Sequence, residues 1–132
     1  MKLSQINFDL SKPSKIEIKD QVTKQSFEKP AFLYVMSIES AEGKRCQLSI
    51  FKEIMKLRES KNKDDEVTPE EIKEASLGHI HELLKGWEGI EDENGEELAY
   101  SEENAITLLK EYELIFNLVN IESSKLGNFI RG

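Results

Sequence analysis

Hydrophobic and polar positions alternate in the first part of the chain. The segment Lys15-Ile16-Glu17-Ile18-Lys19 switches between charged and apolar residues, which is typical of a half-buried strand. Residues 31–38 are rich in aromatic and β-branched side chains and are short enough for a second strand. Together they predict an antiparallel β-hairpin, preceded by a loose polar arm at residues 1–14. A lone hairpin is rarely stable, so it needs a helix, a further strand or a partner subunit against it.

The second predicted strand is apolar on both sides. Successive side chains of a strand point to opposite faces. Four of its residues share one face and two share the other, namely Phe32, Tyr34, Met36 and Ile38 against Leu33 and Val35. We therefore expect protein to cover both faces of this strand.

Two helices are predicted in the middle of the chain. Ser40 is a suitable N-cap for a helix that runs to about residue 60. Thr68 gives a stronger start signal, because Pro69 suits the first helical position and Glu71 can complete a capping box. From there apolar residues recur at helical spacing as far as Trp87. The residues expected to end this second helix are Gly86 and Gly89.

A connector with turn-forming residues follows. Asn94-Gly95 lies between two short runs and predicts a type I′ turn, in which both residues have positive φ. We expect a short second hairpin here, with Trp87 as a buried core residue beneath it rather than a ligand-stacking ring. Ser101, followed by two glutamates, is the predicted N-cap of the last helix.

The predicted last helix carries more apolar residues than one face can hold. Its main stripe runs from Ala105 to Val119. Such a helix in a small domain is either central or lies against another molecule. Gly127 is expected to end the helix and to leave residues 127–132 as a mobile tail. The residues expected to bind a partner, or to be buried in a homo-oligomer, are Ile106, Leu114, Leu118, Ile121, Phe129 and Ile130.

These patterns predict an α+β fold. It has an N-terminal β-hairpin followed by about three α-helices, with the short second hairpin between the last two helices. A length of 132 residues suits one domain with one core, so we expect residues 1–132 to form a single domain. Hydrophobic residues make up 38% and charged residues 33%, which fits a globular protein rather than a disordered one.

Charge is distributed unevenly along the chain. Residues 1–63 hold 13 Lys and Arg against 8 Asp and Glu, whereas residues 64–132 hold 5 against 18. The acidic half argues against nucleic-acid binding, because phosphate affinity comes largely from clustered basic groups. The asymmetry also allows head-to-tail attraction between copies of the chain.

The sequence also favours a cytoplasmic location. No apolar run approaches the length of a membrane span, and the N-terminus lacks the apolar core of a secretory signal. Cys46 is the only cysteine, so no internal disulfide can form and a reducing cytoplasm is expected.

Candidate chemistry is sparse. Gly43-Lys44 lacks the upstream glycine of a phosphate-binding loop. His79 and His81 are about 200° apart on a helix, so they cannot chelate one metal ion. The acidic residues around Asp92 do not follow the order of a calcium-binding loop. We therefore expect no enzyme activity, no metal and no cofactor.

The stretch from Gly86 to Phe129 resembles the C-terminal part of tail assembly chaperones of long-tailed bacteriophages. In that family a Trp-x-Gly segment leads into a glycine-containing turn and a Ser/Thr-x-x-Asn helix start. The hairpin and helix upstream match the family in organisation. The matching residues here are Trp87, Gly89, Asp92, Gly95, Leu98, Ser101, Glu103 and Asn104. Among these we expect Trp87, Gly89, Gly95, Ser101 and Asn104 to have structural roles.

The resemblance implies a function without catalysis. Family members keep the long helical tape measure protein soluble in the cytoplasm of the bacterial host and help recruit tail tube subunits to it. Two alternatives remain open at the level of sequence. One is a structural virion component, such as a head–tail adaptor or a minor tail protein. The other is an acidic cytoplasmic regulator or antitoxin that masks a basic partner through residues 64–132.

Overall fold

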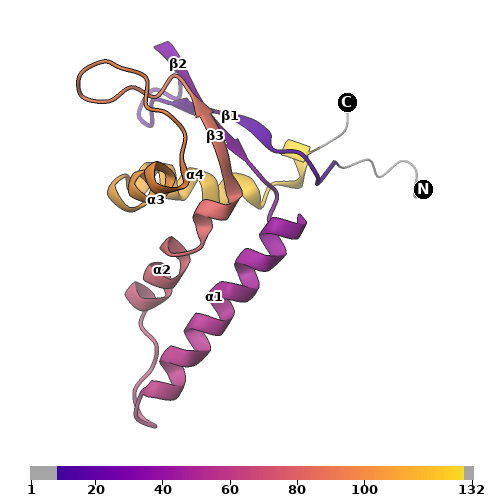
Figure 1. Ribbon diagram of the computed structural model, residues 1–132, viewed down its shortest axis with the longest axis vertical. Coiled ribbons are helices and arrows are strands. Elements are labelled where there is room, and N and C mark those ends of the chain that lie inside the picture. Colours follow the sequence, from indigo (N-terminus) through magenta and orange to yellow (C-terminus); the bar gives the residue numbers. More distant parts are fainter. Residues whose placement is uncertain (1–8, 130–132) are drawn as a thin grey trace, which may run out of the picture.

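A three-stranded antiparallel sheet with helices on one face forms the centre of the protein (Figure 1). The computed structural model describes residues 9–129. It confirms the predicted α+β class and the N-terminal hairpin. The elements in chain order are β1 (Ser14–Lys19), β2 (Ser26–Val35), α1 (Ala41–Ser60), α2 (Pro69–Leu77), the 3-10 helix η2 (Ile80–Leu83), β3 (Leu84–Glu88), α3 (Glu102–Glu111), α4 (Glu113–Ser123) and the 3-10 helix η3 (Leu126–Phe129).

Strand β2 lies in the middle of the sheet, between β1 and β3. Leu33 pairs with Ile16 of β1 and with Trp87 of β3, so apolar residues from all three strands share one face. That face is buried against the helices. Phe32 and Tyr34 lie on the opposite face and are half-buried. The prediction that protein covers both faces of β2 is therefore wrong. The outer face is open, as in many antiparallel sheets with one solvated side.

Strand β3 was not expected. The helix predicted from Thr68 to Trp87 ends ten residues earlier, at Leu77, and gives way to η2 and then to the strand. A run of apolar residues at positions 83, 84 and 87 fits a buried strand as well as a helix. Pairing with β2 decides the outcome here, because it satisfies the backbone groups of the β2 edge. This is the further strand that the hairpin requires.

Helix starts follow their local sequence signals. The Ser40 side chain accepts a hydrogen bond from the Gly43 N–H at 3.0 Å and caps α1. Thr68 and Glu71 form the complete capping box of α2, with Pro69 in the first turn. The Ser101 side chain caps α3 by accepting from the Asn104 N–H at 3.0 Å. All three predicted N-caps are confirmed.

The predicted last helix is interrupted at Tyr112. Its φ and ψ of −119° and 98° end α3, and α4 begins at the next residue. Tyr112 is 53% exposed and does not join the main apolar stripe, as it would in a continuous helix. The break turns the two helices so that both place residues in the core. These residues are Ala105, Leu108, Leu109, Ile115, Phe116 and Val119.

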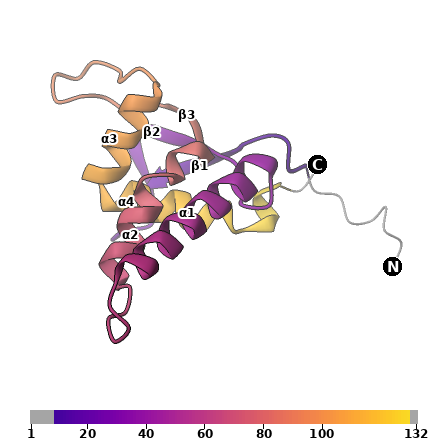
Figure 2. The ribbon, with the colours of Figure 1, turned by 60° about the horizontal axis from the view of Figure 1, so that its bottom comes forward.

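The core lies between the inner face of the sheet and the α3–α4 pair. Leu33, Val35, Leu84, Leu109 and Val119 are fully buried there. Helices α1 and α2 lie side by side and extend away from this core, as the two views of the ribbon show (Figures 1 and 2).

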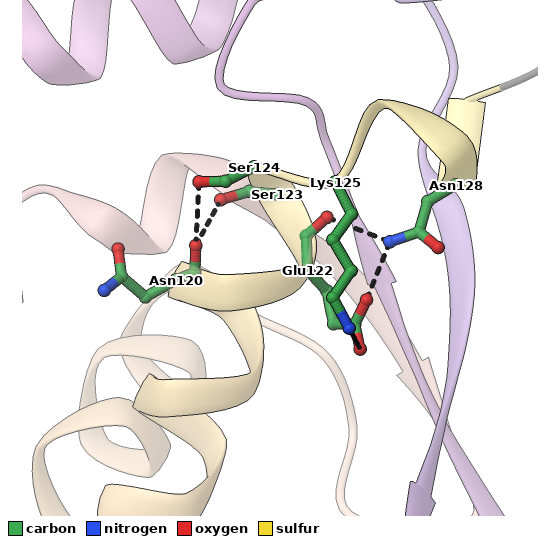
Figure 3. Close-up of polar contacts among 6 residues, drawn as sticks. All are labelled: Asn120, Glu122, Ser123, Ser124, Lys125 and Asn128. Atoms are coloured by element: carbon green, nitrogen blue, oxygen red, sulfur yellow. Dashed lines mark hydrogen bonds and ion pairs between the residues drawn. The ribbon is translucent and has the colours of Figure 1, made fainter.

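A cluster of polar contacts ends α4 (Figure 3). The Asn128 side-chain amide donates to the backbone oxygen of Glu122 at 3.0 Å and to its carboxylate at 2.7 Å. Lys125 pairs with the same carboxylate at 3.2 Å. These bonds hold η3 against the helix end, and Phe129 is buried at 3% exposure. The chain is thus anchored beyond Gly127, where a mobile tail was expected, and residues 130–132 lie outside the described residues.

Candidate functional site

An open groove of about 580 Å³ lies between one end of the sheet, the connector of residues 89–101 and the α3–α4 pair. Its surface is mostly apolar. Ile18 and Ala31, which are cross-strand partners in β1 and β2, contribute from the sheet. Leu108, Leu114 and Ile115 contribute from the helices. The other lining residues are Ile90, Glu91, Asp92, Glu93, Leu98, Asn104, Thr107, Glu111 and Tyr112.

The connector forms one wall of the groove as a small hairpin. The Leu98 N–H donates to the Ile90 oxygen at 2.8 Å, which brings two apolar wall residues side by side. Glu91 and Glu97 form a single antiparallel bridge above them. A compact turn closes the hairpin, and the wall therefore has a defined backbone conformation.

The turn differs in type from the prediction. The Gly95 N–H donates to the Asp92 oxygen at 3.0 Å, so Glu93 and Asn94 occupy the two central positions. Gly95 has the expected positive φ of 80°, but Asn94 does not have positive φ. The prediction of a type I′ turn is therefore wrong. Gly95 instead follows the turn and has a left-handed conformation, as in three-residue hairpin loops. The Asp92 carboxylate stabilises the turn by accepting from the backbone N–H groups of Asn94 and Glu96.

Trp87 fixes the far end of the connector. It is 7% exposed, and its ring meets that of Tyr100 edge to face at a centroid distance of 5.1 Å. The Tyr100 hydroxyl donates to the Leu84 oxygen at 2.8 Å, and the Asn104 amide donates to the Ala99 oxygen at 2.9 Å. Strand β3 and the start of α3 thus hold the connector between them.

Gly89 permits the close passage of the connector over β2. Its φ is 75°, and a Cβ atom at this position would lie 2.3 Å from the Pro30 backbone oxygen. No other residue fits both conditions without a shift of the backbone. Gly86 and Gly89 were expected to end a helix, but α2 ends at Leu77 and Gly86 lies within β3, so the role of Gly89 is to let the connector pass close to β2.

Acidic residues surround the groove. Four carboxylates lie among its lining residues, and no lysine or arginine does. Glu91 faces Lys29 at 3.9 Å, but both side chains are exposed to solvent, where such a pair contributes little. Within residues 9–129, neither Glu93 nor Glu111 forms an ion pair. The rim therefore carries a net negative charge, which the exposed Lys29–Glu91 pair offsets only in part.

Only one of the described residues expected to bind a partner lines the groove. Leu114 lines the groove. Ile106 and Leu118 are half-buried, and Ile121 is 54% exposed on α4. Phe129 is buried, and Ile130 lies outside the described residues. The groove residues of the sheet and connector were not identified as binding residues from the sequence, since no local signal marks them.

A second apolar surface lies on α1. Leu48 and Phe51 are 52% and 58% exposed, at positions that share one side of the helix. Lysines at positions 44, 52 and 56 lie nearby in the sequence of the same helix. Helix α1 as a whole carries more lysine and arginine than glutamate, whereas the charged residues of the groove lining are all acidic.

Reactive side chains are held in unreactive surroundings. Cys46 is buried, its thiol donates to the His79 oxygen at 3.4 Å, and burial together with nearby Glu82 raises its pKa to about 11. His79 and His81 face different carboxylates, those of Glu53 at 3.5 Å and Glu102 at 3.2 Å. Residues 9–129 contain no group of three or more His, Cys, Asp or Glu side chains that could hold a metal ion. None of the helices in this part of the chain combines the length and apolar character needed to span a bilayer.

Comparison with known proteins gives one result. The family described as YdaY prophage protein matches residues 47–131, which include α2, β3, the connector and the last two helices. No curated protein and no solved structure matches the chain.

Proposed function

The chain belongs to the YdaY prophage protein family and is therefore phage-related; we propose that it is a tail assembly chaperone of a long-tailed phage. In this proposal it binds the tape measure protein, keeps it soluble and helps recruit tail tube subunits. It acts by reversible contacts in the cytoplasm of the bacterial host, without catalysis or a cofactor.

The observation that carries the proposal is the open apolar groove beside α3 and α4. Apolar surface left uncovered in a small acidic domain is suited to hold an apolar segment of another protein. The surrounding carboxylates keep such a surface in solution when it is empty. A helix-in-groove contact is non-covalent and therefore reversible.

The residues that resemble tail assembly chaperones also support the proposal. Trp87, Gly89, Gly95, Ser101 and Asn104 all serve to build the connector or to attach it. The connector is one wall of the groove. The segment that resembles the family is therefore the segment that shapes the candidate binding surface.

Co-expression with the tape measure protein of the same prophage tests the proposal. Overlapping segments of that protein are produced with and without this chain, and the soluble fraction of each is measured. We expect at least one apolar helical segment to become soluble and to co-purify with the chain. An unrelated acidic domain of similar size is the control, since it would reveal an effect of charge alone.

Mass spectrometry of purified particles separates the proposal from a structural virion component. A chaperone is absent from the finished particle, whereas an adaptor or minor tail protein is present in it. The proposal would be overturned if the chain keeps none of the segments soluble and is also detected in the purified particle.

A further inference from the structure

We propose that the groove binds one face of a partner helix whose apolar residues are flanked by lysine or arginine. This inference rests on the proposed function and specifies the chemistry of the client segment. The groove is lined by apolar side chains from two strands, the connector and two helices. Its volume of about 580 Å³ exceeds what one side chain fills, so it suits several anchors spaced along a helix.

The apolar floor defines the inner face of the client. Ile18, Leu108 and Ile115 are buried beneath the groove, and Ile90 and Leu98 are half-buried along the connector wall. A polar or charged side chain placed here would lose its hydration without gaining a hydrogen-bond partner. The inner face of the client must therefore be apolar.

The rim defines the flanks of the client. Glu93 on the connector and Glu111 at the end of α3 belong to the groove lining and are exposed. Lysine or arginine beside the apolar face of a client helix would meet these carboxylates at the edges of the contact. Glutamate or aspartate at the same places would meet like charge, which disfavours that partner and slows its approach.

A pair of synthetic helical peptides tests the inference. Both have the same leucine face, and one is flanked by lysines while the other is flanked by glutamates. Binding to the full chain is measured by fluorescence anisotropy at low and high salt. We expect the lysine peptide to bind about tenfold or more tightly at low salt, with a smaller difference at high salt because exposed charges are screened.

Two variants, each with a matched control, test whether the peptides bind in the groove. Glu93→Lys combined with Glu111→Lys should remove the preference for the lysine peptide, whereas Glu59→Lys combined with Asp64→Lys makes the same change in net charge on exposed positions outside the groove lining. Thr107→Trp fills the groove from an exposed position on α3 and should weaken both peptides. Asn120→Trp is its control, since Asn120 is exposed on α4 and does not line the groove.

Equal binding of both peptides, or binding that Thr107→Trp leaves unchanged, overturns the inference. It is also overturned if the chain self-associates and Thr107→Trp abolishes that association, because a second copy, through its basic α1, is then the occupant. The proposed function is judged separately. Tape measure segments that stay soluble with the Thr107→Trp variant leave the chaperone role intact and refute only the groove. If the chain prefers the lysine peptide but has no effect on the solubility of the tape measure protein, the inference about the groove stands and the chaperone role is refuted.

Discussion

The indole N–H of Trp87 donates a hydrogen bond of 2.7 Å to the backbone oxygen of Leu98. This bond joins strand β3 to the end of the connector, and the Leu98 side chain lines the groove. The only tryptophan of the chain therefore supports the wall of the candidate site from below, without lining the site itself.

Substitution of Trp87 should separate its packing from its hydrogen bond. Trp87→Ala should lower the free energy of unfolding by roughly 3–5 kcal/mol, because it leaves a large cavity. Trp87→Phe keeps much of the ring but leaves the Leu98 oxygen without its partner, and should cost about 1–3 kcal/mol. Urea unfolding followed by circular dichroism measures both variants. An unchanged midpoint for Trp87→Ala would contradict the burial of this side chain.

Gly89 and Gly95 both have positive φ, but they should differ in tolerance. At Gly95 the nearest atom to a new Cβ is a glutamate side-chain oxygen at 3.8 Å, so Gly95→Ala should cost about 1–2 kcal/mol for the left-handed backbone alone. Gly89→Ala adds a clash with the Pro30 backbone oxygen and should be clearly more destabilising. Thermal unfolding of the two variants makes the comparison. Equal losses would show that the backbone at Gly89 moves without cost.

At Gly43, helix propensity and packing have opposite effects on the stability of an alanine variant. Alanine favours a helix over glycine by up to about 1 kcal/mol at interior positions, and Gly43 lies in the first turn of α1. A Cβ at Gly43 would, however, lie 2.3 Å from the Ile38 backbone oxygen and 2.5 Å from that of Ser37. We therefore expect Gly43→Ala to destabilise the protein. Gln47→Ala, at an exposed position one turn further along α1, is the control and should be nearly neutral. A gain in melting temperature for Gly43→Ala would contradict the close packing of α1 on this loop.

The sequence predicts a feature well when that feature depends on residues that are close together in the chain. The N-caps at Ser40, Thr68 and Ser101 depend on neighbours within three residues, so they can be predicted from the local sequence alone. Strand β3 depends on pairing with residues about fifty positions away, and its apolar spacing also fits a helix. The break at Tyr112 has no glycine or proline to announce it.

The groove could not be predicted for the same reason. Ile18, Ala31, Ile90, Leu98 and Leu108 come from different segments, and each alone looks like an ordinary core residue. The excess of apolar residues in the predicted last helix was the only signal of a binding surface, and of the residues it indicated, Leu114 is the one that lines the groove. The acidic charge of the second half was visible in the composition, but its concentration around an apolar surface was not.

Glu71 should make stability depend on pH in the acid range. A hydrogen bond from Lys61 at 2.8 Å and another from the Thr68 N–H at 3.0 Å hold its pKa below the ordinary value of 4.5. The folded state therefore binds this proton less readily than the unfolded state. Its stabilising contribution is present above about pH 4.5 and is lost as the pH falls through the lower, folded-state pKa.

Glu71→Gln isolates this charge, because glutamine can still form the capping box. We expect the variant to be less stable than the parent at neutral pH, and the difference to shrink as the pH falls towards about 3. Glu70→Gln is the matched control in the same helical turn, since Glu70 forms no ion pair within residues 9–129. A difference between parent and Glu71→Gln that stays constant with pH would show that the charge of Glu71 is not the cause.

The partner surface should extend from the groove along α4. Leu114 lines the groove, and Leu118 and Ile121 follow it at spacings of four and seven residues, which places the three on one side of the helix. Leu118 also packs against the core, so Leu118→Lys should destabilise the protein by about 1–3 kcal/mol. Ile121 is 54% exposed, and Ile121→Lys should leave the unfolding midpoint nearly unchanged while it weakens capture of the client.

Asn120→Lys is the control for this experiment, because it adds the same charge to a neighbouring exposed position on another side of α4. Unfolding curves and client solubility are measured for all three variants. Weaker capture by Ile121→Lys alone places the client along the α4 stripe as well as in the groove. Equal capture by Ile121→Lys and Asn120→Lys confines the contact to the groove, because a lysine in the middle of an apolar contact cannot be accommodated without loss of affinity.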